Sequence, residues 1–163
     1  YMRHSRILSE GSWYHVFAKI NRGECIFDNK EIKRLFLKVV LRAKTKARHP
    51  YKFEIANFCI MGNHIHFLIR PAKGESLSKI MQWILSVFAI HYNKIIQANG
   101  HVWHDRFKSV IINTIRQFIL VYEYISNNPI KAGLCTLSSA YQYCGEYFIS
   151  KDDFRIIEKD FKF

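Results

Sequence analysis

The chain has 163 residues and is strongly basic, with 25 Lys and Arg against 13 Asp and Glu and a formal charge of +12. Its 49% hydrophobic and 15% aromatic content excludes a largely disordered protein, and its length fits one domain with a sizeable core. It has no apolar run long enough to span a bilayer and no signal-peptide pattern, so we expect no membrane partner. A folded domain this basic usually binds a polyanion, and nucleic acid is the first candidate.

The cysteines favour a reduced, cytoplasmic protein. No two of them have the spacing of a C-x-x-C pair, which a redox site or a zinc site would use. Scattered cysteines of this kind are typical of proteins that form no disulfide. The four residues are Cys25, Cys59, Cys135 and Cys144.

The first part of the chain predicts an arm, a strand and a helix. Residues 1–11 are polar and basic without any period, which is typical of an N-terminal arm. Residues 13–20 predict a strand. Asp28 with Glu31 predicts a capping box that begins a helix, and this helix fades into the basic run at 42–48.

A hairpin and three further elements follow. Residues 53–60 and 63–70 predict paired strands, and Gly62-Asn63 supplies residues that tolerate positive φ in the turn between them. We expect proline 129 to end the third helix, because proline lacks the N–H and clashes with the preceding turn. The later elements are a helix from Ser76 or Ser78 to Gly100, a strand at 107–113, a helix from a Thr114–Gln117 capping box to about Asn127, and at 150–163 either a last short helix or a frayed tail.

This order of elements predicts an α+β fold. A β-α-β-β-α-β series is the ferredoxin-like split arrangement, which implies an antiparallel four-stranded sheet with two helices on one face. The helix after the fourth strand can then lie near the other face. We expect a single domain over residues 1–163, with an N-terminal arm at 1–11 and a C-terminal extension at 146–163.

Two histidines alternate with apolar residues on the third predicted strand. Side chains on a strand point to opposite faces in turn, so Ile65, Phe67 and Ile69 are expected to face the core. His64 and His66 then lie side by side on the opposite face. Neutral imidazole is the commonest metal ligand, although an isolated H-x-H is more often a coincidence of two surface histidines.

The third predicted helix carries two tyrosines in different positions. A wheel at about 100° per residue places one stripe on the core face, formed by Phe118, Val121, Tyr122 and Ile125. Tyr124 and Asn128 lie four residues apart on a flank of that stripe. Because a residue before proline is biased away from helical geometry, the position of Asn128 depends on how far the helix extends.

Paired histidines, a free tyrosine and a basic surface together suggest a nuclease that uses tyrosine as nucleophile. Attack by a phenol oxygen on a phosphodiester forms a covalent phosphotyrosine and keeps the bond energy for religation. A divalent ion would polarise the scissile phosphate. Two imidazoles and an amide oxygen suit Mg²⁺ or Mn²⁺ with weak, substrate-assisted binding.

The sequence resembles the single-tyrosine HUH transposases, and specifically the REP-associated tyrosine transposases. The resemblance covers about residues 12 to 145 in the family's order, and its last two segments are its most specific. One departure is Gly62, where many relatives have proline. The matching segments are 13–16 (WYHV), 61–68 (MGNHIHFL), 100–109 (GHVWHDRFKS) and 124–134 (YISNNPIKAGL).

The resemblance implies an HUH endonuclease fold and a set of site residues. His64 and His66 would be the metal-binding pair, Asn128 the third ligand and Tyr124 the nucleophile, with Mg²⁺ or Mn²⁺ as cofactor. Members of the family cut and join single-stranded DNA beside short palindromic hairpins without ATP. Related enzymes work as homodimers or as monomers, so either state is open.

Basic and aromatic side chains are expected to contact the DNA. Lysine and arginine would hold phosphates, and an exposed tryptophan would stack on an unpaired base, although tryptophan beside a strand is more often packing. The candidates are Lys44, Lys46, Arg48, Arg106 and Lys108 for phosphates and Trp103 for a base.

Three alternatives stay open on the sequence. The first is a non-catalytic ferredoxin-like module that binds DNA or RNA hairpins. The second is a structural zinc site of Cys59 with His64 and His66, which would keep its metal through mild purification. The third is a relaxase or replication initiator. Those enzymes usually have further histidine ligands or paired tyrosines, and Tyr122 with Tyr124 matches such a pair only superficially.

Overall fold

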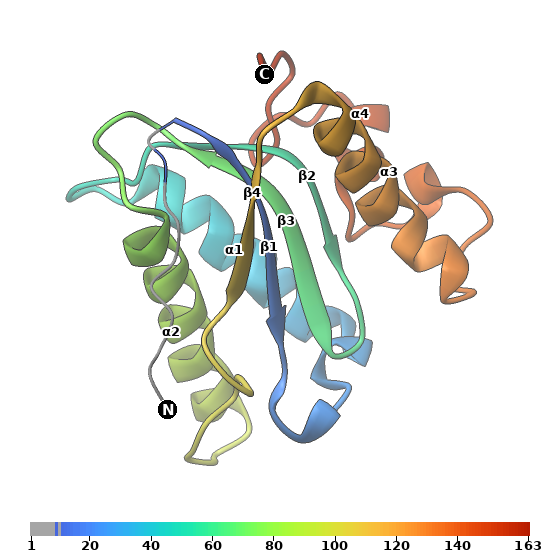
Figure 1. The fold of residues 1–163 in the computed structure, drawn as a ribbon. Helices are drawn as coiled ribbons and strands as arrows, with labels where there is room; N and C mark the ends of the chain where they lie inside the picture. Colours follow the sequence, from blue (N-terminus) through green and yellow to red (C-terminus); the bar gives the residue numbers. More distant parts are fainter. Residues whose placement is uncertain (1–8, 10) are drawn as a thin grey trace, which may run out of the picture.

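The computed structural model describes residue 9 and residues 11–163, so most of the predicted N-terminal arm lies outside the described residues. The chain folds into an antiparallel sheet with helices on both faces (Figure 1). The elements are β1 (Trp13–Lys19), η1 (Asn21–Gly23), η2 (Ile26–Asp28), α1 (Lys30–Thr45), β2 (Phe53–Ile60), β3 (His64–Pro71), α2 (Leu77–Ile95), β4 (Lys108–Ile112), α3 (Ile115–Lys131), η3 (Ser138–Ala140) and α4 (Gly145–Ser150).

The sheet has the predicted ferredoxin-like topology. Its strand order is β2-β3-β1-β4, and every pair is antiparallel. Helices α1 and α2 pack on one face, where the ring of Phe36 on α1 stacks against Phe67 of β3 at 6.1 Å. Helix α3 lies on the other side of the sheet (Figure 1). The α+β prediction is therefore confirmed.

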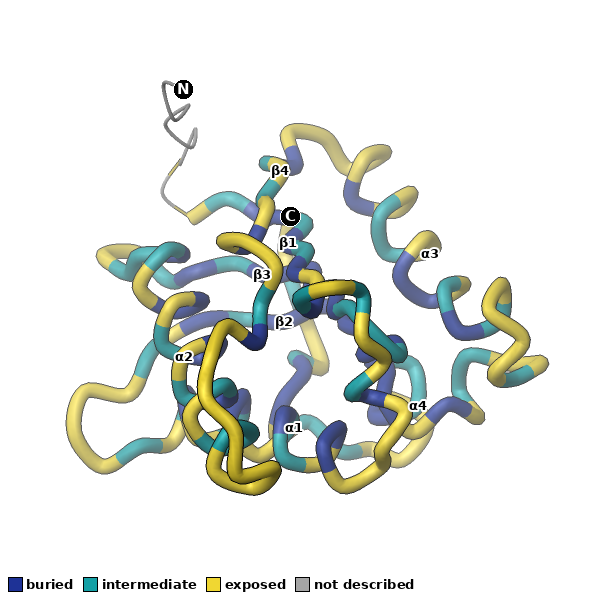
Figure 2. The backbone as a smooth tube through the Cα atoms, turned by 90° about the horizontal axis from the view of Figure 1, so that it is seen from below, coloured by how far each residue is buried: buried dark blue, intermediate teal, exposed yellow. Residues whose placement is uncertain are grey.

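Apolar residues of the sheet and of α1 and α2 form the main core (Figure 2). Ile65, Phe67 and Ile69 are almost completely buried, as their alternation predicts. Burying an apolar side chain of this size stabilises the fold by roughly 1.5–3 kcal/mol. Within the described part of the chain, none of the helices combines the length and apolarity needed to cross a membrane.

Three predicted helix boundaries were wrong. Helix α2 ends at Ile95 rather than at Gly100. The N-cap of α1 is Asn29 rather than Asp28, and its side chain accepts a hydrogen bond from the backbone N–H of Glu31 at 2.8 Å. Helix α3 continues through Pro129 to Lys131. A proline inside a helix removes one hydrogen bond and clashes with the preceding turn, but Pro129 lies in the last turn of α3 and its ring is buried.

The C-terminal prediction was also wrong, because the last helix lies at 145–150 and not at 150–163. The segment after α4 is irregular, yet Ile157 is fully buried. The ring of Phe161 packs edge-on against Trp13, whose Nε1 donates a hydrogen bond to the backbone oxygen of Lys162 at 3.0 Å. Ile157 and Phe161 of the segment after α4 thus pack against the rest of the fold without forming a helix.

The hairpin turn between β2 and β3 does not use the positive φ that glycine permits. Gly62 and Asn63 have no positive φ. A Cβ on Gly62 would lie 2.7 Å from Oδ1 of Asp28, so a larger residue here would require the Asp28 carboxylate to shift. The glycine therefore permits close contact between the turn and the segment before α1.

Candidate active site

His64 and His66 lie on the face of the sheet turned toward α3. The sequence predicts that both lie on the face away from α1 and α2, and α3 covers part of this face, so that His66 is only 3% exposed. His64 is half-buried, and its Nδ1 lies 2.7 Å from Oδ1 of Asn63. Since an amide oxygen only accepts, this Nδ1 donates the proton. The Nε2 atom of His64 is then free to bind a metal.

His15 is a site residue that the sequence reasoning missed. Its Nε2 lies 2.9 Å from Nδ1 of His66, and the two rings stack at 5.1 Å. The contact arises because β1 pairs with β3 and brings His15 diagonally opposite His66. The alternation of β1 contained a signal, because it places His15 and Phe17 on the face away from buried Val16. A hydrogen bond at Nδ1 orients the His66 ring with Nε2 available.

All three imidazoles are neutral near neutral pH. Burial lowers the pKa of His66 from its ordinary value to about 3, and repulsion from His15 and His64 adds to this effect. Burial also lowers the pKa of His15 and of His64, the latter with a further contribution from Lys19. Neutral imidazole is the form that binds divalent metals.

Acid is expected to destabilise the metal-free protein below pH 6.5. A histidine with a pKa near 3 when folded and 6.5 when unfolded binds its proton first in the unfolded chain. The free energy of unfolding therefore falls as the pH falls through this window, by at most about 1.4 kcal/mol per pH unit for one group. Urea unfolding with EDTA at several pH values measures the slope. The His66→Gln variant should show a shallower slope, and an equal slope would contradict this origin.

Helix α3 places Tyr124 beside the histidines. Its ring centroid lies 5.4 Å from that of His66 and 5.8 Å from that of His15, and the residue is 44% exposed. Tyr122 instead packs against Phe118 and Phe161, and burial raises its pKa, with Glu146 adding to the shift. The two tyrosines thus have the positions that the helical wheel predicts.

A buried polar network fixes α3 on the sheet. Asn57 of β2 is fully buried, and its Nδ2 donates to Oγ of Ser126 at 2.8 Å and to the backbone oxygen of Tyr122 at 3.1 Å. Ser126 in turn donates to Oε1 of Glu146 at 3.2 Å. A buried amide left without partners would be costly, so this network specifies one position of the helix. That position sets where Tyr124 lies.

Asn128 is the residue on α3 best placed to supply a third metal ligand. It lies one turn after Tyr124, and its Nδ2 donates to the backbone oxygen of Tyr124 at 2.8 Å. Its amide oxygen has no hydrogen bond among the described contacts. No group of three or more His, Cys, Asp and Glu suited to a metal occurs in the described residues, so a third protein ligand would have to be of another type. Two neutral imidazoles with an amide oxygen fit weak binding of Mg²⁺ or Mn²⁺.

The structure gives no support to a zinc site at Cys59. This residue lies opposite His66 in the β2–β3 pair and is fully buried. Its Sγ contacts Sδ of Met61 at 3.4 Å, and burial raises the pKa of the thiol. A buried, protonated thiol is a poor zinc ligand, because the metal binds the thiolate.

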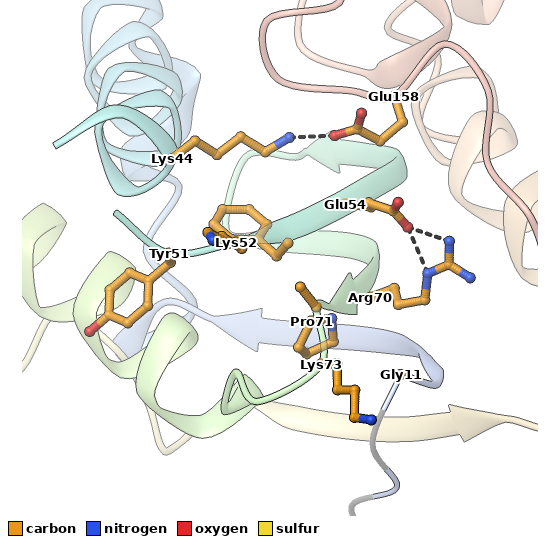
Figure 3. Close-up of a pocket in the computed structure, with 11 residues that line it drawn as sticks. Gly11, Lys44, Tyr51, Lys52, Glu54, Arg70, Pro71, Lys73 and Glu158 are labelled. Carbon is orange, nitrogen blue, oxygen red and sulfur yellow. Dashed lines mark hydrogen bonds and ion pairs between the residues drawn. The ribbon is translucent and has the colours of Figure 1, made fainter. Parts of the chain in front are cut away.

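Lys44 was expected to hold a DNA phosphate, but its ammonium group is engaged within the protein. Its Nζ donates to Oε1 of Glu158 at 2.8 Å and to the backbone oxygen of Ile156 at 2.9 Å. Figure 3 shows this pair in a pocket that also contains the Arg70–Glu54 pair. The pocket lies at the end of β3 farthest from His64. Lys44 therefore stabilises the C-terminal segment.

The other basic residues of this end are partly engaged. Nζ of Lys46 lies 4.1 Å from the ring centroid of Tyr51 and 5.1 Å from that of Trp83, which are cation–π distances. Arg48 is exposed on the loop after α1. Both precede the end of β2 that pairs with Pro71, which is the end of β3 away from His64.

The remaining candidates for DNA contact lie in the loop before β4 and at the start of β4, and they differ in exposure. Trp103 is a packing residue, because its Nε1 donates to the backbone oxygen of Leu85 at 2.9 Å and its ring contacts Phe88. The expected base stacking on Trp103 does not fit this packing. Arg106 and Lys108 are exposed, and Lys108 lies on the histidine face of the sheet.

An antiparallel sheet with a two-histidine strand, beside which a covering helix places a tyrosine, defines a tyrosine transposase of the HUH type. The chain belongs to the IS200-like transposase family, since the model of that family, described as Transposase IS200 like, matches residues 9–128. The predicted family and enzyme class are thereby confirmed.

A solved structure of a transposase has the same fold. A REP-associated tyrosine transposase bound to a REP hairpin matches with a TM-score of 0.76 and 16% identity, covering 100% of this chain and 95% of that chain. A protein assigned as a transposase from Deinococcus radiodurans R1 matches with a TM-score of 0.49 and 11% identity, covering 77% of this chain and 97% of its own. No curated protein matched the sequence.

Proposed function

We propose that this protein cuts and rejoins single-stranded DNA beside a hairpin through a covalent bond to Tyr124. The observation that carries the proposal is the position of this tyrosine, whose ring lies 5.4 Å from that of His66. The similar transposase was solved with a REP hairpin, which supports hairpin DNA as the substrate class here. The excess of basic residues fits such a partner.

The residues divide the reaction between them. The phenol of Tyr124 loses its proton and its oxygen attacks phosphorus, so that a new Tyr–O–P bond forms and one phosphodiester P–O bond breaks. The oxygen of the departing strand takes up a proton and leaves as a hydroxyl group. Rejoining reverses these changes with a strand hydroxyl as attacking group. His64, His66 and Asn128 would hold Mg²⁺ or Mn²⁺, which when bound supplies polarisation of the scissile phosphate. With Nε2 of His66 kept for the metal, its Nδ1–H donates to Nε2 of His15, and this hydrogen bond keeps His66 oriented for that role.

One chain contains all the residues that the proposal needs. Tyr124 lies beside the histidines of its own sheet, so a monomer suffices and a homodimer is not required. A cytoplasmic location belongs to the same proposal, because the four cysteines are free and a reducing compartment would keep them so.

Binding is expected to favour a hairpin with single-stranded flanks over a random duplex, and to weaken steeply with salt. Each phosphate neutralised by Lys or Arg releases counterions, so the logarithm of affinity falls linearly with the logarithm of salt concentration. Fluorescence anisotropy of labelled oligonucleotides in EDTA measures both effects. Equal affinity for the duplex and the flanked hairpin would contradict the proposed substrate class.

Formation of a covalent complex tests the reaction itself. A flanked hairpin taken from palindromes beside the protein's own gene is incubated with the protein and Mn²⁺, then separated on a denaturing gel. A labelled band at the mass of the protein plus DNA is expected. Tight binding without such a band would instead identify a non-catalytic hairpin-binding module.

A further inference from the structure

Part of the histidine face of the sheet is not covered by α3. This helix packs mainly against β2, and less against β3 and β4. On the neighbouring strands, Val110 of β4 is 62% exposed and Lys108 is exposed, while His15 and Phe17 of β1 are half-buried. A strip of sheet surface therefore borders the histidines on the side away from α3.

Phe17 is the unusual residue of this strip. It pairs with His66 of β3 on one side and with Lys108 of β4 on the other. Its ring centroid lies 5.1 Å from that of His66 and 5.6 Å from that of His64. Among the described residues, it is neither part of the hydrophobic core nor one of the partly buried residues packed against it.

Stability alone does not explain a phenylalanine here. A large apolar side chain normally gains its free energy by burial against other apolar groups, whereas the only rings within reach of Phe17 among the described residues are two imidazoles. Aromatic rings open to solvent beside basic residues are the platforms on which proteins stack unpaired bases. Trp103, the aromatic residue expected to do this, is engaged in packing.

We propose that Phe17 stacks on an unpaired base of the single-stranded flank, at a nucleotide next to the phosphate that Tyr124 attacks. This inference rests on the proposed function. Phe17 contacts both histidine rings, so a base on its open face would lie immediately beside the site of cleavage. Val110 extends the apolar surface, and Lys108 is placed to contact a neighbouring phosphate.

Stacking of this kind tolerates any base, because every base has a π-face. Phe17 would thus contribute to affinity and to positioning of the strand, with little sequence preference. The loss expected on removing the aromatic ring is about fivefold to 100-fold in affinity for flanked DNA. Affinity for a hairpin without a flank should stay within about twofold of wild type, because its stem has no unpaired base.

The test compares Phe17→Leu, which keeps an apolar side chain of similar volume but removes the π-face, with Phe17→Trp, which retains one. Dissociation constants are measured in EDTA for a hairpin with an oligothymidine flank, without a flank, and with an abasic site at each flank position in turn. Ile90→Ala is the matched control, because Ile90 is an exposed apolar residue on α2, across the sheet.

We expect Phe17→Leu to weaken binding of the flanked hairpin only, and Phe17→Trp to restore it. At one flank position the abasic site should weaken wild type but have no further effect on Phe17→Leu. A 2-aminopurine base at that position should be quenched on binding wild type and not on binding Phe17→Leu. The proposal would be overturned if Phe17→Leu lost the same affinity for abasic and intact flanks at every position, or if it lost no affinity for either.

These measurements need neither metal nor cleavage. If wild type forms no covalent complex but the Phe17-dependent abasic effect is present, stacking stands and the catalytic proposal fails. If wild type forms the covalent complex and Phe17→Leu binds every substrate as tightly as wild type, the catalytic proposal stands and stacking fails.

Discussion

The Tyr124→Phe variant is expected to form no covalent complex with hairpin DNA while binding it as tightly as wild type. The substitution removes only the hydroxyl group, and the ring that lies 5.4 Å from that of His66 stays in place. Loss of a nucleophile lowers turnover by on the order of 10⁶-fold, which is beyond detection here. A denaturing gel of labelled oligonucleotide with Mn²⁺ measures the complex, and anisotropy measures binding.

Tyr122→Phe is the matched control for this experiment. Its ring packs against Phe118 and Phe161, and phenylalanine preserves that packing, so cleavage should be retained. The Tyr122 hydroxyl forms a hydrogen bond with Glu146. Its loss is therefore expected to lower the free energy of unfolding and to leave cleavage unchanged. A covalent complex with Tyr124→Phe but none with Tyr122→Phe would reverse the assignment of the nucleophile.

The His64→Ala variant is expected to lose cleavage that depends on Mg²⁺ or Mn²⁺ and to keep its fold. His64 is half-buried and its side-chain hydrogen bond goes only to the neighbouring Asn63. His66→Ala should lose the same activity but also lower the free energy of unfolding by about 1–3 kcal/mol, because a buried imidazole is removed and His15 loses its partner.

Titration of Mn²⁺ by calorimetry, in the presence of hairpin DNA, measures the metal site independently of cleavage. His104→Ala serves as control, since this histidine is exposed on the loop before β4. Wild-type cleavage and metal binding by His64→Ala would remove His64 from the proposed site, and the same result with His66→Ala would contradict the site assignment. Reduced thermal stability confined to His66→Ala would agree with the difference in burial between the two residues.

Local backbone geometry explains which predictions succeeded. The alternation around His66 identified the face of the sheet because successive side chains of a strand must point to opposite sides. The wheel separated Tyr122 from Tyr124 because a residue's direction on a helix follows from its number. Both rules hold wherever the chain is strand or helix, whatever packs against it. They therefore required only the order of the residues.

The failed boundaries have a different origin. Asn29 and Asp28 are both good N-caps, and the choice between them depends on where the preceding turn leaves the backbone. Pro129 remains inside α3, in the last turn of the helix, where its ring is buried. Ile157 is buried without a helix because the C-terminal segment packs onto the sheet. Each outcome depends on contacts between distant parts of the chain.

Contacts between distant parts of the chain also determine which residues make up the site. From the sequence alone came the two-histidine strand, the flank tyrosine and the asparagine one turn later. Pairing of β1 with β3 added His15, and α3 buried His66. The C-terminal segment engages Lys44, and α2 engages Trp103, whereas Phe17 remains half-buried beside the histidines. The period of a strand or helix determines which way a side chain points, but only the assembled layers determine whether water, protein or substrate lies in that direction.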